Sequence, residues 1–140
     1  MLTTFALMTL LQAAPAASTA DPFLTRARAI LKTTPLIDGH NDVPWAIRTA
    51  REKPFDVEAY DLRRRTPGQT DLPRMAEGQM GGQFWSVYIP GEEETKKLGY
   101  AKVQLEQIDI AKRVIEKYSD RLEFVTESSQ VMPAFRKGKV

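Results

Sequence analysis

The 140-residue sequence contains no cysteine and only one histidine. Without cysteine, disulfide bonds and every zinc site built from thiolates are excluded. The single histidine is more restrictive, because a catalytic zinc usually has three protein ligands, mostly histidines, and a two-metal site needs more. The chain therefore cannot easily assemble a catalytic metal site by itself.

The sequence also has little net charge, with a formal value of +2 at pH 7. Such a small value gives no electrostatic reason to expect nucleic acid or an anionic membrane as a partner. Three consecutive arginines, Arg63 to Arg65, could grip phosphate, but a run of this kind is more often a solvated face. The 42% hydrophobic and 27% charged content is that of a soluble globular protein long enough for one domain.

Residues 1–20 have the pattern of a secretory signal peptide. An apolar run over Phe5 to Leu11 precedes small residues, with plausible cleavage sites after Ala16 or Ala20. The segment lacks the usual Lys or Arg, and a buried N-terminal helix is the alternative, but Pro15 favours a processed tail. It is too short and too soon broken for a transmembrane helix. We predict an exported protein, periplasmic if the source is a bacterium, with membrane association left open.

The rest of the chain alternates between helical and extended patterns. Asp21-Pro22 predicts a helix start. We expect this helix to end at about residue 33, a strand to begin at Leu36, and a polar connection to follow over 46–69. After it we expect a short helix from 71 to 76, a buried strand over 84–89 and one long helix over 95–118. A last helix is capped by Ser128 and ended by Gly138, and a further strand starts at 139–140.

This alternation predicts an α/β fold with a parallel sheet. Two strands cannot complete such a sheet, because parallel strands are normally buried on both faces and paired on both sides. A (β/α)₈ barrel takes about 250 residues. We therefore expect residues 21–140 to be the N-terminal, incomplete portion of a TIM-like barrel, preceded by the signal peptide over 1–20.

The most informative stretch contains the one histidine between two aspartates, Asp38-Gly39-His40-Asn41-Asp42. In an extended chain Asp38, His40 and Asp42 project to one side, where an imidazole and a carboxylate can bind one metal ion. Pro44 prevents a central strand from continuing and favours an extended Val43. The pair would then lie at the end of a strand, where barrel enzymes collect catalytic residues. The alternative is a core histidine whose ring is bonded to an aspartate.

Two blocks of this sequence resemble the membrane dipeptidases, also called renal dipeptidases, a family of zinc metallopeptidases. They are LIDGHNDVPW at 36–45, and residues 70–75 continuing through GGQFWSVY at 81–88. The resemblance implies that His40 and Asp42 bind one of two zinc ions, and that Trp45 and Tyr88 line the substrate site. It also implies attack of a metal-bridging hydroxide on the peptide carbonyl. The family's other metal and substrate residues come from later strands, so no catalytic residue is assigned.

The resulting hypothesis is zinc-dependent hydrolysis of dipeptides by the complete protein, with this chain inactive alone. A homodimer of the complete protein is a possible assembly. A catalytically silent receptor of the same fold is one alternative, although intact His40 and Asp42 count against it. Another metal-dependent amidohydrolase is less favoured, because those enzymes typically begin with His-x-His on the first strand and this chain has His-x-Asp.

Overall fold

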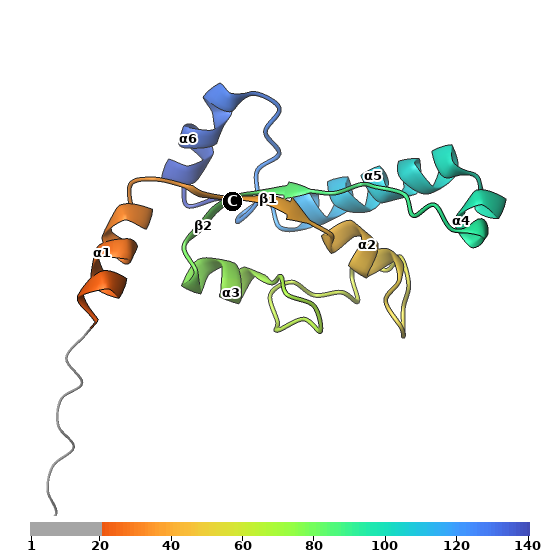
Figure 1. Ribbon diagram of the computed structural model, residues 1–140, viewed down its shortest axis with the longest axis horizontal. Coiled ribbons are helices and arrows are strands. Elements are labelled where there is room, and N and C mark those ends of the chain that lie inside the picture. Colours follow the sequence, from red (N-terminus) through yellow and green to blue (C-terminus); the bar gives the residue numbers. More distant parts are fainter. Residues whose placement is uncertain (1–20) are drawn as a thin grey trace, which may run out of the picture.

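A computed structural model describes residues 21–140, so the predicted signal peptide lies outside the described residues (Figure 1). The described chain is mixed α/β, with one small parallel sheet among helices. In order, its elements are α1 (Pro22–Leu31), β1 (Leu36–Asn41), α2 (Val43–Arg48), α3 (Leu72–Glu77), β2 (Met80–Trp85), α4 (Glu93–Leu98), α5 (Tyr100–Lys117) and α6 (Ser128–Arg136).

The sheet consists of β1 and β2, paired in parallel from Leu36 opposite Met80 to Asn41 opposite Trp85. Figure 1 shows α3 and α6 on opposite sides of this strand pair. The two strands approach closely at their start because Gly81 has no side chain. A Cβ atom placed there would lie 2.5 Å from Cβ of Pro35. The glycine is therefore a packing requirement of the sheet.

The predicted second strand was placed too far along the chain. We expected a buried strand over 84–89, whereas β2 ends at Trp85 and Phe84 is 67% exposed. The last ladder bond runs from Ser86 N to Asn41 O at 2.8 Å. Beyond it β2 has no strand partner among residues 21–140, because the chain after β1 has already turned into α2. The pair of glycines at 81–82, which precedes the predicted strand, belongs to the strand itself.

The segment after β1 also differs from the prediction. Val43 was expected to be extended before Pro44, but it is the first residue of α2. Proline is tolerated in the first turn of a helix, where its missing N–H would have no intrahelical partner. The Asn41 side chain accepts the Val43 N–H at 3.2 Å and so caps this turn. The connection after α2 is less solvated than expected, since it buries Val57 and Leu62.

The other helix boundaries follow local signals. Asp21 caps α1 by accepting the Phe23 N–H at 2.9 Å, and Asp71 caps α3 by accepting the Arg74 N–H at 2.8 Å. At α6 the cap is Glu127, not Ser128, because Glu127 and Gln130 form a capping box. Gly138 follows the end of α6 with a positive φ of 74°.

The predicted long helix over 95–118 is two helices, because Gly99 adopts a φ of +88° between α4 and α5. The buried face of α5 is also rotated from the apolar stripe that the sequence predicts through Leu105, Ile108, Ala111 and Ile115. Leu105 of that stripe is 66% exposed. The buried positions are Val103, Gln107, Ile110 and Val114, and the last three each precede a predicted position by one residue.

The hydrophobic core lies between α2, α3, α5 and the connections that join them. It is formed by Val43, Ile47, Val57, Leu62, Leu72, Met75, Ile110, Val114, Tyr118 and Leu122. Tyr118 is 1% exposed, and its hydroxyl accepts the Leu62 N–H at 2.8 Å and donates to Asp61 at 3.1 Å. One tyrosine thus fixes the long connection against the end of α5.

A buried ion pair holds the entry to α3. The Asp71 carboxylate is fully buried and accepts hydrogen bonds from Thr66 N at 3.2 Å and from Arg74 Nε at 2.6 Å. Arg74 in turn donates to the carbonyl oxygen of Gly68 at 2.6 Å. Burial alone would raise the pKa of Asp71, but the backbone N–H donors and the Arg74 guanidinium outweigh it and lower that pKa. The arginine run at 63–65 is exposed, as expected, and Arg63 pairs with Asp120 at 2.9 Å.

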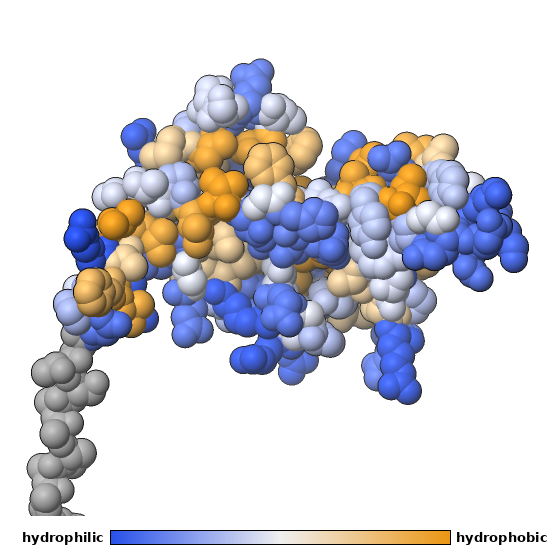
Figure 2. All heavy atoms as spheres, viewed as in Figure 1, coloured by the Kyte–Doolittle hydropathy of each residue, from blue (hydrophilic) through white to orange (hydrophobic). Residues whose placement is uncertain are grey.

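An apolar hollow of about 380 Å³ remains open between β2, α5 and α6. Ile108, Ala111 and Ile115 of α5 line it, together with Phe84 and Phe124. Figure 2 shows apolar surface over the strands and α6, and a second apolar area over α4 and α5. Leu98 of α4 and Leu105 of α5 are exposed. No closed barrel is formed within residues 21–140, and no helix among them is long and apolar enough to cross a membrane.

We predict that Gly81→Ala will lower the free energy of unfolding by about 1–3 kcal/mol, because the new methyl group meets Pro35 and the start of β1. Gly91→Ala is the matched control, since nothing lies within 4 Å of a Cβ atom there. Urea denaturation of both variants measures the effect. Equal unfolding midpoints for the two variants would contradict the close approach.

We also predict that Asp71→Asn will destabilise the fold and flatten its acid dependence. Since the folded-state pKa of Asp71 is lowered, its stabilisation is fully present above the unfolded pKa, about 4, and is lost as pH falls through the folded value. Wild type should therefore lose stability below about pH 4 more steeply than the variant. Urea midpoints from pH 3 to 7 test this, with the exposed Asp109→Asn as control for the loss of one carboxylate.

Candidate metal and substrate site

The predicted site residues lie at or shortly after the carboxyl ends of the two parallel strands. His40 is the penultimate residue of β1, Asp42 follows it, and Trp45 lies on α2. Tyr88 lies three residues beyond the end of β2. Because parallel strands run in the same direction, both chains leave the sheet at the same edge. This edge is where ligands bind in open α/β sheets.

His40 and Asp42 form a close pair at this edge. His40 Nε2 lies 3.0 Å from Asp42 Oδ1, and the side chains are 68% and 49% exposed. The alternative of a buried core histidine is therefore wrong, although the bond to an aspartate is present. Asp42 is the N-cap of α2 and makes no side-chain capping bond. Both side chains are thus presented to solvent with a nitrogen and an oxygen donor together.

Asp38 does not join this pair. Its Oδ1 accepts the backbone N–H of His40 at 3.2 Å, and its Oδ2 accepts Gln83 Nε2 from β2 at 3.0 Å. Gln83 Oε1 then accepts the Trp85 indole N–H at 2.9 Å. The carboxylate therefore joins the two strands and holds the backbone of His40, which leaves the imidazole free to turn outward.

Asn41 is a site-positioning residue that sequence reasoning missed. Its amide nitrogen donates to Thr70 Oγ1 at 2.7 Å, and its carbonyl oxygen accepts the Val43 N–H. The second bond is a local Asx turn, which an asparagine two residues before the start of a helix could have signalled. The first bond joins residues 29 apart in sequence and had no local signal.

Trp45 and Tyr88 are the second pair that the structure brings together. Their ring centroids are 5.7 Å apart at an interplanar angle of 49°, a tilted contact within the favourable range for aromatic pairs. Trp45 is half-buried and Tyr88 is 45% exposed. Within the described residues no hydrogen bond or ring contact links this aromatic pair to His40 or Asp42.

Polar contacts from α5 hold the segments that carry both aromatic residues. Arg48 of α2, 7% exposed, pairs with Glu106 of α5 at 2.7 Å. Its guanidinium carbon lies 5.8 Å from the centre of the Trp45 ring. Gln107, the next residue of α5, donates from Nε2 to the carbonyl oxygen of Tyr88 at 2.9 Å. None of these supporting contacts was expected from the sequence.

The donors of His40 and Asp42 suit part of a zinc site. Imidazole nitrogen and carboxylate oxygen are common zinc ligands, and two ligands of one tetrahedral zinc lie about 3.3 Å apart. The 3.0 Å separation of His40 Nε2 and Asp42 Oδ1 is close to this. Among residues 21–140, no further histidine, aspartate or glutamate side chain completes a group of three that could hold a metal.

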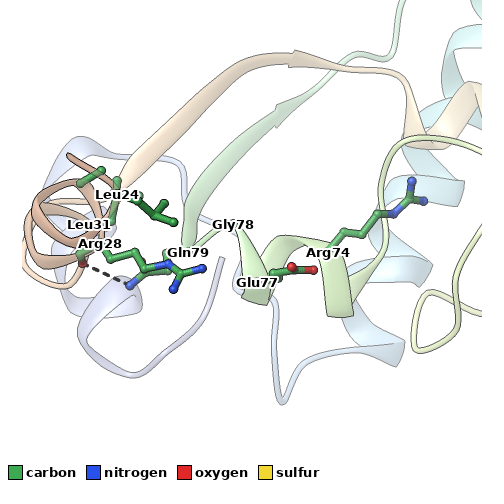
Figure 3. Close-up of a pocket in the computed structure, with 8 residues that line it drawn as sticks. Leu24, Arg28, Leu31, Arg74, Glu77, Gly78 and Gln79 are labelled. Atoms are coloured by element: carbon green, nitrogen blue, oxygen red, sulfur yellow. Dashed lines mark hydrogen bonds between the residues drawn. The ribbon is translucent and has the colours of Figure 1, made fainter. Parts of the chain in front are cut away.

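The apolar hollow beside β2 is not lined by His40, Asp42, Trp45 or Tyr88, and neither is a second hollow near α1. Figure 3 shows the other hollow, of about 410 Å³, where Arg28 and Leu31 of α1 face the end of α3. It is bridged by a long bond of 3.5 Å from Gln79 Nε2 to the Arg28 carbonyl. It lacks a histidine and a pair of acidic residues, so it offers no alternative metal site.

One comparison with known proteins bears on this arrangement. A family model described as membrane dipeptidase (peptidase family M19) matches residues 24–140. The match includes β1 with His40 and Asp42 and continues through β2 to the end of α6. It confirms the resemblance carried by the two sequence blocks. This chain belongs to the membrane dipeptidase family.

Proposed function

We propose that this chain supplies the first metal ligands and part of the substrate pocket of a zinc-dependent dipeptidase. Membership of the family supports a peptidase that acts on dipeptides. The observation that carries the assignment of residues is the exposed His40–Asp42 pair at the carboxyl end of β1, with its donor atoms 3.0 Å apart. Two donors alone hold a metal weakly, so the proposal requires ligands from outside the described residues.

In this proposal His40 and Asp42 hold one zinc ion between them. The imidazole is the stronger neutral donor, and the carboxylate supplies charge that offsets the charge of the cation. Bound zinc polarises a carbonyl and lowers the pKa of water, which is the chemistry that peptide hydrolysis needs. Both side chains are exposed, which would leave room for an ion held between His40 Nε2 and the Asp42 carboxylate.

Asp38 acts one step away from the metal. Its bonds to the His40 N–H and to Gln83 hold the end of β1 against β2. Groups that orient metal ligands in this way are worth about 10–100-fold in affinity or rate. Removing the Asp38 charge should therefore weaken the site without abolishing it.

Trp45 and Tyr88 form the proposed wall of the substrate pocket. A dipeptide has two charged ends and short side chains, so an aromatic wall can contact its apolar part while polar groups hold its termini. The Tyr88 hydroxyl makes no hydrogen bond within residues 21–140 and can donate one to a ligand. The His40–Asp42 pair and the aromatic pair leave the sheet at one edge, which supports assigning both roles to one site.

We further propose that residues 21–140 form the first part of a TIM-like barrel. The open apolar hollow beside β2 and α5 supports this, because a parallel sheet is normally covered on both faces. Val140 supports it as well. Its N–H donates to Arg121 O at 2.9 Å and its carbonyl oxygen accepts the Glu123 N–H at 3.1 Å, which is the bonding pattern of parallel strands.

The metal proposal predicts a graded series of losses in the complete protein. His40→Ala should remove about one of two zinc ions and nearly all dipeptide hydrolysis, because the stronger donor is lost. Asp42→Asn should keep the fold but still lose most of the rate, because an amide oxygen binds zinc weakly. Asp38→Asn should be mildest, at about 10–100-fold. Elemental analysis and dipeptide hydrolysis measure the series.

Asp109→Asn, on the exposed surface of α5, is the control for a lost carboxylate and should keep full zinc content and activity. Residues 21–140 alone should hydrolyse no dipeptide at any zinc concentration. Full zinc content and activity in His40→Ala would refute the ligand assignment. Zinc binding by the complete protein without hydrolysis of any dipeptide would favour the silent receptor.

Export is a separate proposal, based on the apolar segment of residues 1–20. In a secreting host, the mature N-terminus should fall near Ala17 or Asp21, because the small residues before these positions suit the signal peptidase. Intact mass and N-terminal sequencing of the exported fraction measure this. An unprocessed Met1 in that fraction would show that the segment is not a cleaved signal.

A further inference from the structure

The segment that carries Tyr88 makes no backbone hydrogen bond to β1. β2 ends at Trp85, and the last bond to β1 is made by Ser86. After that, the Tyr88 N–H has only a bond of 3.3 Å to the Ser86 hydroxyl. The Tyr88 carbonyl oxygen accepts the side chain of Gln107 at 2.9 Å. This bond is the one polar contact by which a helix holds the backbone of Tyr88 within the described residues.

Gln107 is an unusual residue for its place on α5. Its side chain is fully buried, on the face where Val103, Ile110 and Val114 are also buried. Its carbonyl oxygen Oε1 has no hydrogen-bond partner among the described residues. A buried polar atom without a partner lowers stability, and a methionine of similar size would avoid the cost. Packing therefore does not explain the glutamine, whereas the bond to Tyr88 does.

Trp45, the other member of the aromatic pair, is held independently through Glu106, the residue next to Gln107. Glu106 pairs with Arg48 at 2.7 Å. The Arg48 guanidinium lies over the Phe55 ring at 4.6 Å and near Trp45 at 5.8 Å. Because Trp45 is held through Arg48, loss of the Gln107 bond should move Tyr88 and leave Trp45 in place. The distance between the two rings is then the quantity that Gln107 controls.

We propose that Gln107 is a positioning residue, whose bond to the Tyr88 carbonyl sets the Tyr88 ring against Trp45 and so sets the affinity for the substrate. The inference rests on the proposed function for its substrate, and the position of the ring is tested without any substrate. Gln107 touches no reacting group. It acts by keeping the pocket wall preformed, which spares the dipeptide the cost of ordering a loose segment.

The variant that tests this is Gln107→Met, which keeps the side-chain volume and removes the donor. Gln104→Met is the matched control, since Gln104 is an exposed glutamine on the same helix. Both are made in the complete protein with 3-fluorotyrosine incorporated at position 88. The ¹⁹F resonance of that ring senses the ring current of Trp45, and Trp45→Leu gives the resonance position when that neighbour is absent.

We expect Gln107→Met to move the ¹⁹F resonance toward the Trp45→Leu position, and Gln104→Met to leave it unchanged. The melting temperature of Gln107→Met should not fall, because the unpartnered Oε1 is removed along with the donor. KM for a dipeptide should rise about three- to ten-fold, the value of one hydrogen bond, while kcat changes less than about two-fold. A purely structural role would instead lower the melting temperature and give no selective rise in KM over the change in kcat.

The two proposals fail in different ways. A wild-type ¹⁹F resonance in Gln107→Met would refute the positioning role, whatever the kinetics. A shifted resonance with an unchanged KM would support the positioning role and refute Tyr88 as a substrate contact. If Gln107→Met is too unstable to purify, Gln107→Glu replaces it. Its ionised carboxylate cannot donate to the Tyr88 carbonyl, and its protonated form can. The resonance should then move between the shifted and the wild-type positions as this carboxyl titrates, and a resonance unchanged through that titration would overturn the proposal.

Discussion

The arrangement depends on where the parallel ladder ends. The bond from Ser86 N to Asn41 O is the last between β1 and β2. Beyond it, the first chain turns into α2 and the second becomes irregular, so the side chains that follow are released from the alternation of a strand. Asp42, the first residue after β1, meets His40 of the strand end, and Tyr88 can reach Trp45.

The parts of the structure that sequence could predict are those with local causes. Asp21-Pro22 and Asp71 predict helix starts, because a capping side chain accepts a hydrogen bond from a backbone N–H only two or three residues away. The His-x-Asp motif was correctly placed at the end of a strand for a similar reason, since the apolar run before it and Pro44 after it are adjacent in sequence. Membership of the family was also predictable, because two short blocks carry it.

The parts that sequence could not predict depend on distant partners. Gly81 precedes the strand predicted from the sequence, and only its approach to Pro35, 46 positions earlier, shows why it belongs to β2. The apolar spacing of α5 was real, but Leu105 is exposed and Gln107 is buried, because the choice of face is made by α2 and the Tyr88 segment. The bond from Asn41 to Thr70 likewise joins residues 29 apart in sequence, so no local pattern predicts it.

The two halves of the proposed site are supported in different ways, and this bears on how the site is completed. The aromatic wall is already held by α5, through Arg48 on one side and Gln107 on the other. The metal pair is exposed and has only its backbone held, by the Asp38 carboxylate. A pocket wall must be preformed to be selective, whereas metal ligands gain their order from the ion they share. In a parallel sheet each strand end can contribute only one or two ligands, so a site of four or more must be spread over several strands. If His40 and Asp42 are the ligands proposed above, their small number fits the first strand of such a site.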